Sequence, residues 1–252
     1  MSNADDMIIL IPARMAASRL PGKPMADIGG KPLIEHVWQR AVQSDIAPVV
    51  VATDHDAIYR HIQSCGGNAV MTSSDHASGS DRIYEALMTW DPEGTYQTII
   101  NLQGDLPTIT KAAIAALADM MASDRCDLAT LVARATDDEI NRSQVVKAVI
   151  SWYETTDDSS VPIGRAHYFS RLPVPYNAQD YWHHIGLYGW RRSALARFIS
   201  LAPSPLETTE KLEQLRALEA GMIIDAGLID EAPGGVDTVE DLEAVREILA
   251  PH

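Results

Sequence analysis

The sequence predicts an α/β protein with a mostly parallel sheet that carries helices on both faces, and an inserted antiparallel subdomain. Two observations lead to this prediction. In the first half of the chain, short apolar runs alternate with segments of helical periodicity, which is the pattern of βαβ units. From residue 127 to about residue 203, strand-like runs dominate instead. We therefore expect an α/β core over 7–126 plus 204–252, with a subdomain over 127–203 inserted in it.

Four apolar runs in the first half predict buried strands, over 7–12, 49–53, 69–72 and 98–102. Helical spacing follows each run. Gly66 ends the helix after the second run, Ser78 opens the helix after the third, and Thr110 caps the helix after the fourth. Ligands of such sheets bind beyond the carboxyl ends of the strands. We therefore expect the loops after these strands to converge on one site.

The second half of the chain predicts a different arrangement. Strand-like runs cover 128–133, 145–152, 167–171 and 184–190, and 157–160 has the composition of a hairpin turn. A helix is expected over 210–220, and a strand over 222–229. The spacing of Thr238 and Asp241 predicts the start of a final helix that continues through Leu249.

Composition excludes several functional classes. The 252 residues carry a formal net charge of −15 and a pI near 4.8, which argues against nucleic-acid or anionic-membrane partners. No apolar stretch reaches membrane-spanning length, and the N-terminus lacks a signal-peptide pattern. Cys65 and Cys126 stand apart without metal-ligand spacing, which predicts buried, reduced thiols in a cytoplasmic protein.

The segment from Ile11 to Pro24 has the features of a phosphate-binding loop. It joins a predicted strand to a predicted helix and carries Arg14, Arg19 and Lys23 among small residues. Small residues let backbone N–H groups approach an anion, and the cations offset its charge. The segment matches neither the P-loop nor the dinucleotide-binding pattern. The alternative is an exposed basic loop that binds nothing.

Two acidic residues are candidates for binding Mg²⁺. Asp105 directly follows a predicted buried strand, and Asp237 precedes the last predicted helix. Magnesium is usually held by one or two protein carboxylates, and phosphates and waters complete its octahedron. The alternatives are that Asp105 is a turn residue before Pro107 and that Asp237 extends a helix N-cap.

The chain resembles the 3-deoxy-manno-octulosonate cytidylyltransferase (CMP-Kdo synthetase) family over about residues 7–245. The resemblance rests on Ile11–Pro24, Val51–Asp54, Met71–Thr72, Ser78–Gly79, Asn101–Pro107, Tyr168–Arg171, His184, Gly186–Gly189, Leu212–Arg216 and Val236–Thr238. The first motif also occurs in other nucleotide-sugar-forming transferases. The combination of Tyr-Phe-Ser-Arg with Leu-Glu-Gln-Leu-Arg is specific. The resemblance implies a nucleotide-diphospho-sugar transferase-like fold and transfer of CMP from CTP to the sugar acid Kdo.

The resemblance also implies a role for each matched residue. The CTP-binding residues are Arg14, Ser18, Arg19, Lys23, Ser78 and Gly79. The sugar-binding residues are Gln103, Arg171, His184, Tyr188, Glu213 and Gln214, and the Mg²⁺ ligands are Asp105 and Asp237. Arg14, Lys23, Asp105 and Asp237 are the catalytic candidates. Each of three residues also has a structural alternative. Arg171 could form a surface ion pair, His184 could be a packed histidine, and Tyr188 could be a core aromatic.

The sequence departs from the family pattern at two places, which affect the expected substrate preference and leave the reaction class unchanged. Leu106 stands where many family members have an acid, and Ser80-Asp81 replaces the more familiar Thr-Glu. An 8-amino variant of Kdo and other sugar acids therefore remain alternatives, with a non-catalytic nucleotide-binding protein as the distant one. The family is generally dimeric, and we expect a homodimer through 127–203, where Trp152, Phe169 and Trp190 lie on an apolar face.

Overall fold

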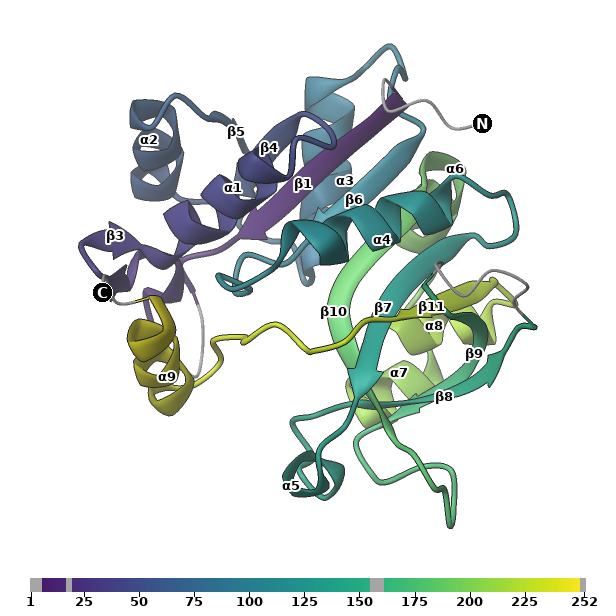
Figure 1. Ribbon diagram of the computed structural model, residues 1–252. Coiled ribbons are helices and arrows are strands. Elements are labelled where there is room, and N and C mark those ends of the chain that lie inside the picture. The colour runs from purple at the N-terminus through teal and green to yellow at the C-terminus, as the bar shows by residue number, and fades with distance from the viewer. Residues whose placement is uncertain (1–5, 17–19, 155–160, 250–252) are drawn as a thin grey trace. The chain divides into compact units, whose positions relative to one another are not determined.

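The computed structural model describes residues 6–16, 20–154 and 161–249 (Figure 1). The chain forms two compact units. The inserted unit is Ala116–Ala232, and the core unit comprises the described residues before Ala116 and from Pro233 onward. The subdomain boundaries predicted at 127 and 203 stay a prediction.

The core unit contains a parallel sheet with the strand order β5-β4-β1-β6. Its strands are β1 (Met7–Ala13), β4 (Val49–Thr53), β5 (Asn68–Met71) and β6 (Thr98–Leu102). β1 pairs with β4 on one side and with β6 on the other, in the registers Ile9↔Val49 and Ile9↔Ile100. β1, β4 and β6 are buried along their whole length, which explains why their sequences are continuous apolar runs. The four predicted strands of this half are confirmed.

Helices connect these strands. They are α1 (Leu33–Ser44), α2 (Asp56–Ser64) and α3 (Gly79–Trp90). α4 (Lys111–Met121) follows β6 and extends past Ala116 into the inserted unit, and α9 (Val239–Leu249) follows that unit. A short 3₁₀ helix, η2 (Lys23–Met25), and the small hairpin of β2 (Asp27–Ile28) and β3 (Lys31–Pro32) lie between β1 and α1. Right-handed crossovers place α1 and α2 on one face of the sheet and α3 on the other (Figure 1). The predicted covering of both faces is confirmed.

The inserted unit contains β7 (Leu128–Arg134), β8 (Lys147–Trp152), β9 (Ile163–Ser170), β10 (Trp182–Arg191) and β11 (Ile224–Leu228). Its strand order is β10-β7-β11-β9-β8, and β8 also pairs with β10. These five described strands therefore close on themselves. The strand pairs formed within 127–203, β7 with β10, β8 with β10 and β8 with β9, are antiparallel as predicted. β11, which the prediction placed outside the inserted subdomain, runs parallel to β7.

Four short helices complete the inserted unit: α5 (Asp137–Ile140), α6 (Arg192–Ile199), α7 (Pro205–Glu210) and α8 (Gln214–Glu219). The single helix predicted over 210–220 is wrong, because Lys211 adopts a left-handed conformation with φ 55° and ends α7. The capping box of Ser204 and Glu207 begins α7 earlier than the apolar spacing indicated. The predicted turn at 157–160 lies outside the described residues.

The apolar face expected to need a partner is largely buried within the single chain. Phe169 is fully buried, and Trp190 is 2% exposed and packs against Phe198. Trp152 makes an edge contact with Trp182. That motivation for a dimer is therefore wrong for Phe169 and Trp190, because the closed sheet supplies its own core.

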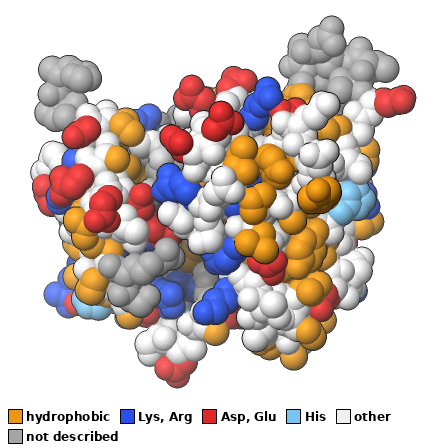
Figure 2. Space-filling view, turned by 90° about the horizontal axis from the view of Figure 1, so that it is seen from below, with side chains coloured by type: hydrophobic (Ala, Val, Ile, Leu, Met, Phe, Trp, Pro, Cys, Tyr) orange, Lys and Arg blue, Asp and Glu red, His pale blue; other side chains and the backbone are white. Residues whose placement is uncertain are grey.

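Among the described residues, no helix combines the length and apolar character needed to cross a membrane. The acidic side chains are dispersed over the face shown in Figure 2 rather than gathered into one patch.

Candidate active site

The core unit has a cleft of about 290 Å³ where loops follow the carboxyl ends of β1 and β6. It is lined by Pro12, Ala13, Arg14, Leu20, Lys23, Pro24, Ser78, Gly79, Arg82, Gln103, Gly104, Asp105 and Asp237. Seven of these residues are predicted site residues that come from four separate segments of the chain. The expected convergence is confirmed for the loops after β1, β5 and β6, whereas no residue of the fully described loop after β4 lines the cleft.

Lys23 lies at the centre of a charged cluster in this cleft. Its ammonium donates to Asp105 Oδ2 at 2.7 Å, to the Val236 carbonyl at 2.8 Å and to Asp237 Oδ1 at 3.3 Å. Gly22 precedes it with φ 73°, a conformation that glycine adopts without strain, and this turn leads directly into η2. The fold therefore brings two distant carboxylates to one cation.

The two carboxylates fit a magnesium ion. They are hard oxygen donors that face the same point and line the same cleft, and the cleft leaves room for phosphates and waters as further ligands. Thr238 accepts from the Asp241 amide and is the N-cap of α9, so Asp237 lies directly before the cap and the cap-extension alternative stays open. The Asp241 carboxylate in turn accepts from the amides of Asp237 and Thr238.

The N-terminus of α3 forms another wall of the cleft. Ser78 is the N-cap: its Oγ accepts from the Asp81 amide, while Asp81 Oδ2 accepts from the Ser78 amide. A Cβ atom at Gly79 would lie 3.3 Å from Pro12 Cγ and 3.5 Å from Gln103 Oε1. A larger residue at this position would therefore crowd the end of β1.

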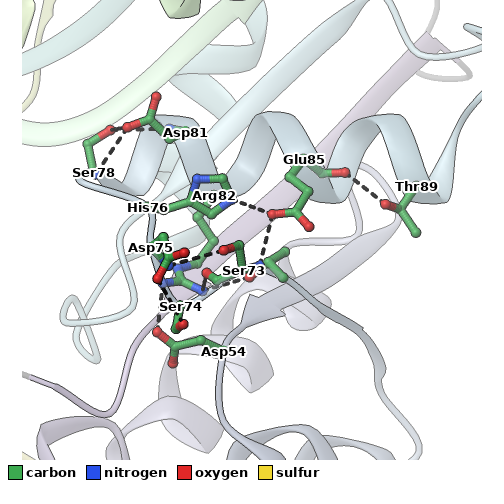
Figure 3. A network of polar contacts seen from close by, with 11 residues as sticks. Asp54, Ser73, Ser74, Asp75, His76, Ser78, Asp81, Arg82, Glu85 and Thr89 are labelled. Atoms are coloured by element: carbon green, nitrogen blue, oxygen red, sulfur yellow. Dashed lines mark hydrogen bonds and ion pairs between the residues drawn. The ribbon is translucent and has the colours of Figure 1, made fainter.

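Arg82 also lines the cleft, although no sequence pattern singles it out. Its side chain is 2% exposed and donates to Asp54 Oδ2 at 2.8 Å (Figure 3). It also donates to Thr72 Oγ1 at 2.6 Å. Asp54 and Thr72 follow β4 and β5, so Arg82 ties α3 to the ends of both strands. A buried arginine held by one carboxylate adds a fixed positive charge beside the cleft.

Asn101, in β6, orients the side chain of Gln103 through a hydrogen bond. Gln103 Nε2 donates to Asn101 Oδ1 at 3.3 Å, and Asn101 is only 1% exposed. This bond directs the Gln103 amide, whose Oε1 lies close to Gly79. Asn101 therefore acts on the site through Gln103.

Ser18 and Arg19, predicted to bind CTP, lie outside the described residues. Arg14 is exposed and lines the cleft. Of the three cations predicted for the phosphate-binding loop, the structure therefore places Arg14 and Lys23 at one cleft.

The other predicted sugar-binding residues belong to the inserted unit. Arg171 follows β9, and its guanidinium donates to the carbonyls of Glu210, Lys211 and Ser143. Two of these acceptors are carbonyls at the end of α7, so Arg171 stabilises the break before α8. A guanidinium has five N–H groups, which leaves one on Nη1 and one on Nη2 beyond these three bonds. The surface ion pair considered for Arg171 is not what the structure shows.

His184 is a buried histidine in β10. Its ring contacts Phe169 and Tyr188, and its Nε2 lies 3.1 Å from Thr130 Oγ1. The Thr130 hydroxyl donates to backbone carbonyls, so the neutral imidazole carries its proton on Nε2 and donates to Thr130. Burial, with a smaller contribution from His183, lowers the pKa of His184 to about 3.

Gln214 is also enclosed, and Tyr188 is partly buried. Burial, and secondarily the Glu213 carboxylate, raise the pKa of the Tyr188 phenol well above its usual range. Gln214 is 5% exposed, and its buried Nε2 has no hydrogen-bond partner in the structure. Glu213 is the N-cap of α8, next to Gln214 in the chain. An unmet amide donor is costly unless a ligand or water accepts from it.

The chain is similar in sequence to known proteins over most of its length. A family model described as Cytidylyltransferase matches residues 8–224. The 3-deoxy-manno-octulosonate cytidylyltransferase of Rhodopseudomonas palustris (strain HaA2) is 53% identical over 244 residues, which cover 96% of this chain and 97% of the relative. That of Paramagnetospirillum magneticum is 51% identical over 243 residues and covers 96% and 97% of the two chains.

Solved structures show the same fold. A CMP:2-keto-3-deoxy-manno-octonic acid synthetase complexed with CTP superposes with a TM-score of 0.85 at 39% identity, covering 97% of this chain and 98% of that one. The 4-diphosphocytidyl-2C-methyl-D-erythritol synthase of Anaerococcus prevotii has a TM-score of 0.65 at 10% identity, covering 99% and 100%, and shows likeness of fold alone. The predicted α/β fold class is confirmed.

Proposed function

The chain belongs to the 3-deoxy-manno-octulosonate cytidylyltransferase (CMP-Kdo synthetase) family, and from this we propose that it converts CTP and Kdo into CMP-Kdo and diphosphate. The observation that carries the proposal is the convergence of Lys23, Asp105 and Asp237 in one cleft. The two carboxylates can hold a metal ion, and the lysine and the arginines of the cleft lining can bind the phosphates of a nucleotide. The product is the activated form of a sugar acid used for lipopolysaccharide.

In the proposed reaction, the anomeric hydroxyl oxygen of Kdo forms a bond to the α-phosphorus of CTP. The bond from that phosphorus to the oxygen bridging to the β-phosphate breaks, diphosphate leaves with its electron pair, and the hydroxyl proton passes to water. Arg14 and Lys23 are placed to bind the phosphates and to offset the charge on the leaving group. A magnesium ion held by Asp105 and Asp237 would neutralise phosphate charge and acidify the attacking hydroxyl when bound.

No dedicated general base is part of this proposal. The described lining of the cleft contains no histidine, and its lysine is held as an ammonium by two carboxylates. An anomeric hydroxyl is more acidic than an ordinary alcohol. Positioning and charge neutralisation therefore account for the rate, as in phosphoryl transfers generally.

The proposed roles of the binding residues follow the resemblance. Ser78 and Gly79 would lie against the cytosine, where the tight space at Gly79 favours a small base edge. Ser18 and Arg19 would bind CTP. The proposed Kdo-binding residues are Gln103, Arg171, His184, Tyr188, Glu213 and Gln214. The orphaned Gln214 amide and the two remaining N–H groups of Arg171 support this, because a hydroxylated carboxylic acid supplies acceptors for both.

A homodimer and a cytoplasmic location are proposed on the family resemblance alone. The dimer would use the inserted unit, whose exposed Leu172 and Tyr176 follow β9. A monomer mass by light scattering at micromolar concentration would refute the dimer.

Diphosphate release from CTP tests the proposed function. Kdo, 8-amino-Kdo and a sialic acid are offered in turn, with Mg²⁺ present. We expect the fastest release with Kdo. Faster release with 8-amino-Kdo or the sialic acid would change the substrate and keep the reaction class, whereas no release with any sugar acid would favour the non-catalytic binding protein.

A further inference from the structure

Three potential metal ligands meet in the core unit outside the cleft-lining residues. Glu35 on α1 and His61 and Cys65 at the end of α2 place one ligand atom each within 4.8 Å of one another. Glu35 is buried, whereas His61 and Cys65 are half-exposed. None of the three belongs to the proposed catalytic machinery. We propose that Glu35, His61 and Cys65 form a second metal site that takes a borderline transition-metal ion such as Zn²⁺ or Co²⁺.

The distances between these atoms suit such an ion. Cys65 Sγ lies 3.7 Å from His61 Nε2, close to the separation of about 3.6 Å that tetrahedral zinc with Zn–S and Zn–N bonds of about 2.3 and 2.0 Å imposes. Glu35 Oε2 lies 2.9 Å from the same nitrogen. A metal ion would therefore take the place of the proton on His61 Nε2, which moves to Nδ1 in the other neutral tautomer, and the ligand atoms need only small shifts.

Neighbouring residues already orient the carboxylate. Gln39 Nε2 donates to Glu35 Oε1 at 2.9 Å, and Lys31 Nζ lies 3.4 Å from the same oxygen. Both bonds go to Oε1, which leaves Oε2 to face His61. Such outer partners fix the geometry of metal ligands in proteins and contribute to affinity.

The ligand chemistry selects the class of metal. Thiolate and imidazole favour zinc, cobalt or copper over magnesium and calcium. One thiolate and one carboxylate balance the two positive charges of the ion, and the exposed side leaves a fourth position for water. The thiolate is the ligand form of cysteine, so metal binding displaces the thiol proton. The balance is M²⁺ plus Cys65–SH giving Cys65–S–M⁺ plus H⁺.

Titration of the metal-free full chain with Co²⁺, in excess Mg²⁺ to occupy the acids of the cleft, tests the proposal. We expect one saturable site with a near-ultraviolet sulfur-to-cobalt absorption and release of about one proton per ion. Cys65→Ser should abolish that absorption and Cys126→Ser should keep it. Glu35→Gln and His61→Asn should weaken binding by more than about tenfold, and His36→Asn, a matched histidine on α1, should leave it unchanged.

Alkylation of the unmodified chain provides a test that does not depend on variant folding. Saturating Zn²⁺ should slow modification of Cys65 by iodoacetamide, as measured by peptide mass mapping. Unchanged alkylation, absorption that survives in Cys65→Ser, or wild-type affinity in Glu35→Gln would overturn the site.

Discussion

Lys23 and Asp105 lie 82 positions apart in the chain, and their side chains form an ion pair of 2.7 Å in the cleft. The Lys23 side chain is only 15% exposed, and the same ammonium reaches Asp237. This contact joins the loop after β1, the loop after β6 and the segment before α9. The proposed reaction depends on these three segments meeting at one point.

Replacement of Lys23 by Met should weaken CTP binding. A charge-assisted contact to a phosphate contributes about 1.5–3 kcal/mol, so the Kd for CTP should rise by roughly tenfold to a hundredfold. Isothermal titration calorimetry measures the change. Lys111→Met, at an exposed position at the start of α4, is the matched control. Unchanged CTP affinity in Lys23→Met would remove Lys23 from the phosphate site.

Asp105→Asn and Asp237→Asn should each cut turnover severely. Each change removes a negative charge and weakens a hard-cation ligand while keeping the shape of the side chain. The double variant should lose much less than the product of the single losses, because groups that act as a unit are not additive. Excess Mg²⁺ should partly rescue either single variant. Glu240→Gln, an exposed acid in the first turn of α9, is the control.

The double-variant comparison separates two accounts of these acids. Near-normal turnover of Asp237→Asn would remove Asp237 from the metal site. Strictly multiplicative losses would mean that the two carboxylates serve different steps.

Arg171→Ala should harm the use of Kdo more than the binding of CTP. It removes a candidate partner for the sugar carboxylate and also the donors that hold the carbonyls of Glu210 and Lys211. Apparent Kdo affinity should fall by roughly tenfold to a hundredfold. Arg134→Ala, an exposed arginine paired with Asp180 in the same unit, is the control. Loss of CTP binding with intact Kdo affinity would contradict the proposed role.

His184 should make the protein less stable in mild acid. Because the folded-state pKa of about 3 lies below the ordinary value of 6.5, the unfolded chain binds the proton more readily between those limits. This contribution is complete above pH 6.5 and decreases as the pH falls towards 3. Between pH 6.5 and 5, the free energy of unfolding should fall by about 2 kcal/mol, since one pH unit corresponds to about 1.4 kcal/mol.

Urea unfolding at pH 7, 6 and 5 measures this slope. In His184→Gln the decline between pH 6.5 and 5 should be smaller than in the wild type. The His183→Gln control is needed because burial also lowers the pKa of the neighbouring His183. Equal slopes in His184→Gln and the wild type would show that His184 does not carry the effect.

The nucleotide site should prefer CTP over UTP and reject purines. Gly79 packs closely against Pro12 and Gln103, and an unmatched base edge there would leave buried polar groups unpaired. Gly79→Ala should raise the KM for CTP. Equal turnover with ATP and CTP would contradict the assignment of Ser78 and Gly79 to the base.

Local sequence predicted the core unit well. The limits of β4 and β6 coincide with the apolar runs 49–53 and 98–102, because a strand buried on both faces needs such a run. The N-caps Ser78 and Thr238 were also visible, since capping depends on residues three apart.

Features of the structure that depend on long-range contacts could not be predicted from local sequence. The break between α7 and α8 involves Arg171, about 40 positions away, which binds the carbonyls at the end of α7. Lys147 is fully buried, with its ammonium held by three carbonyls, which no local pattern indicates. The spacing of His61 and Cys65 could have suggested a ligand pair, but the fold alone brings Glu35 to them.

Phosphorus NMR of the complete reaction tests the central claim most directly. With chain, Mg²⁺, CTP and Kdo together, the three CTP resonances should be replaced by one phosphodiester signal and one diphosphate signal, in equal molar amounts and matched to the Kdo consumed. Omission of Kdo should leave CTP intact. Formation of CDP and a phosphorylated sugar, or CTP that stays unchanged with Kdo present, would contradict attack of the sugar at the α-phosphorus.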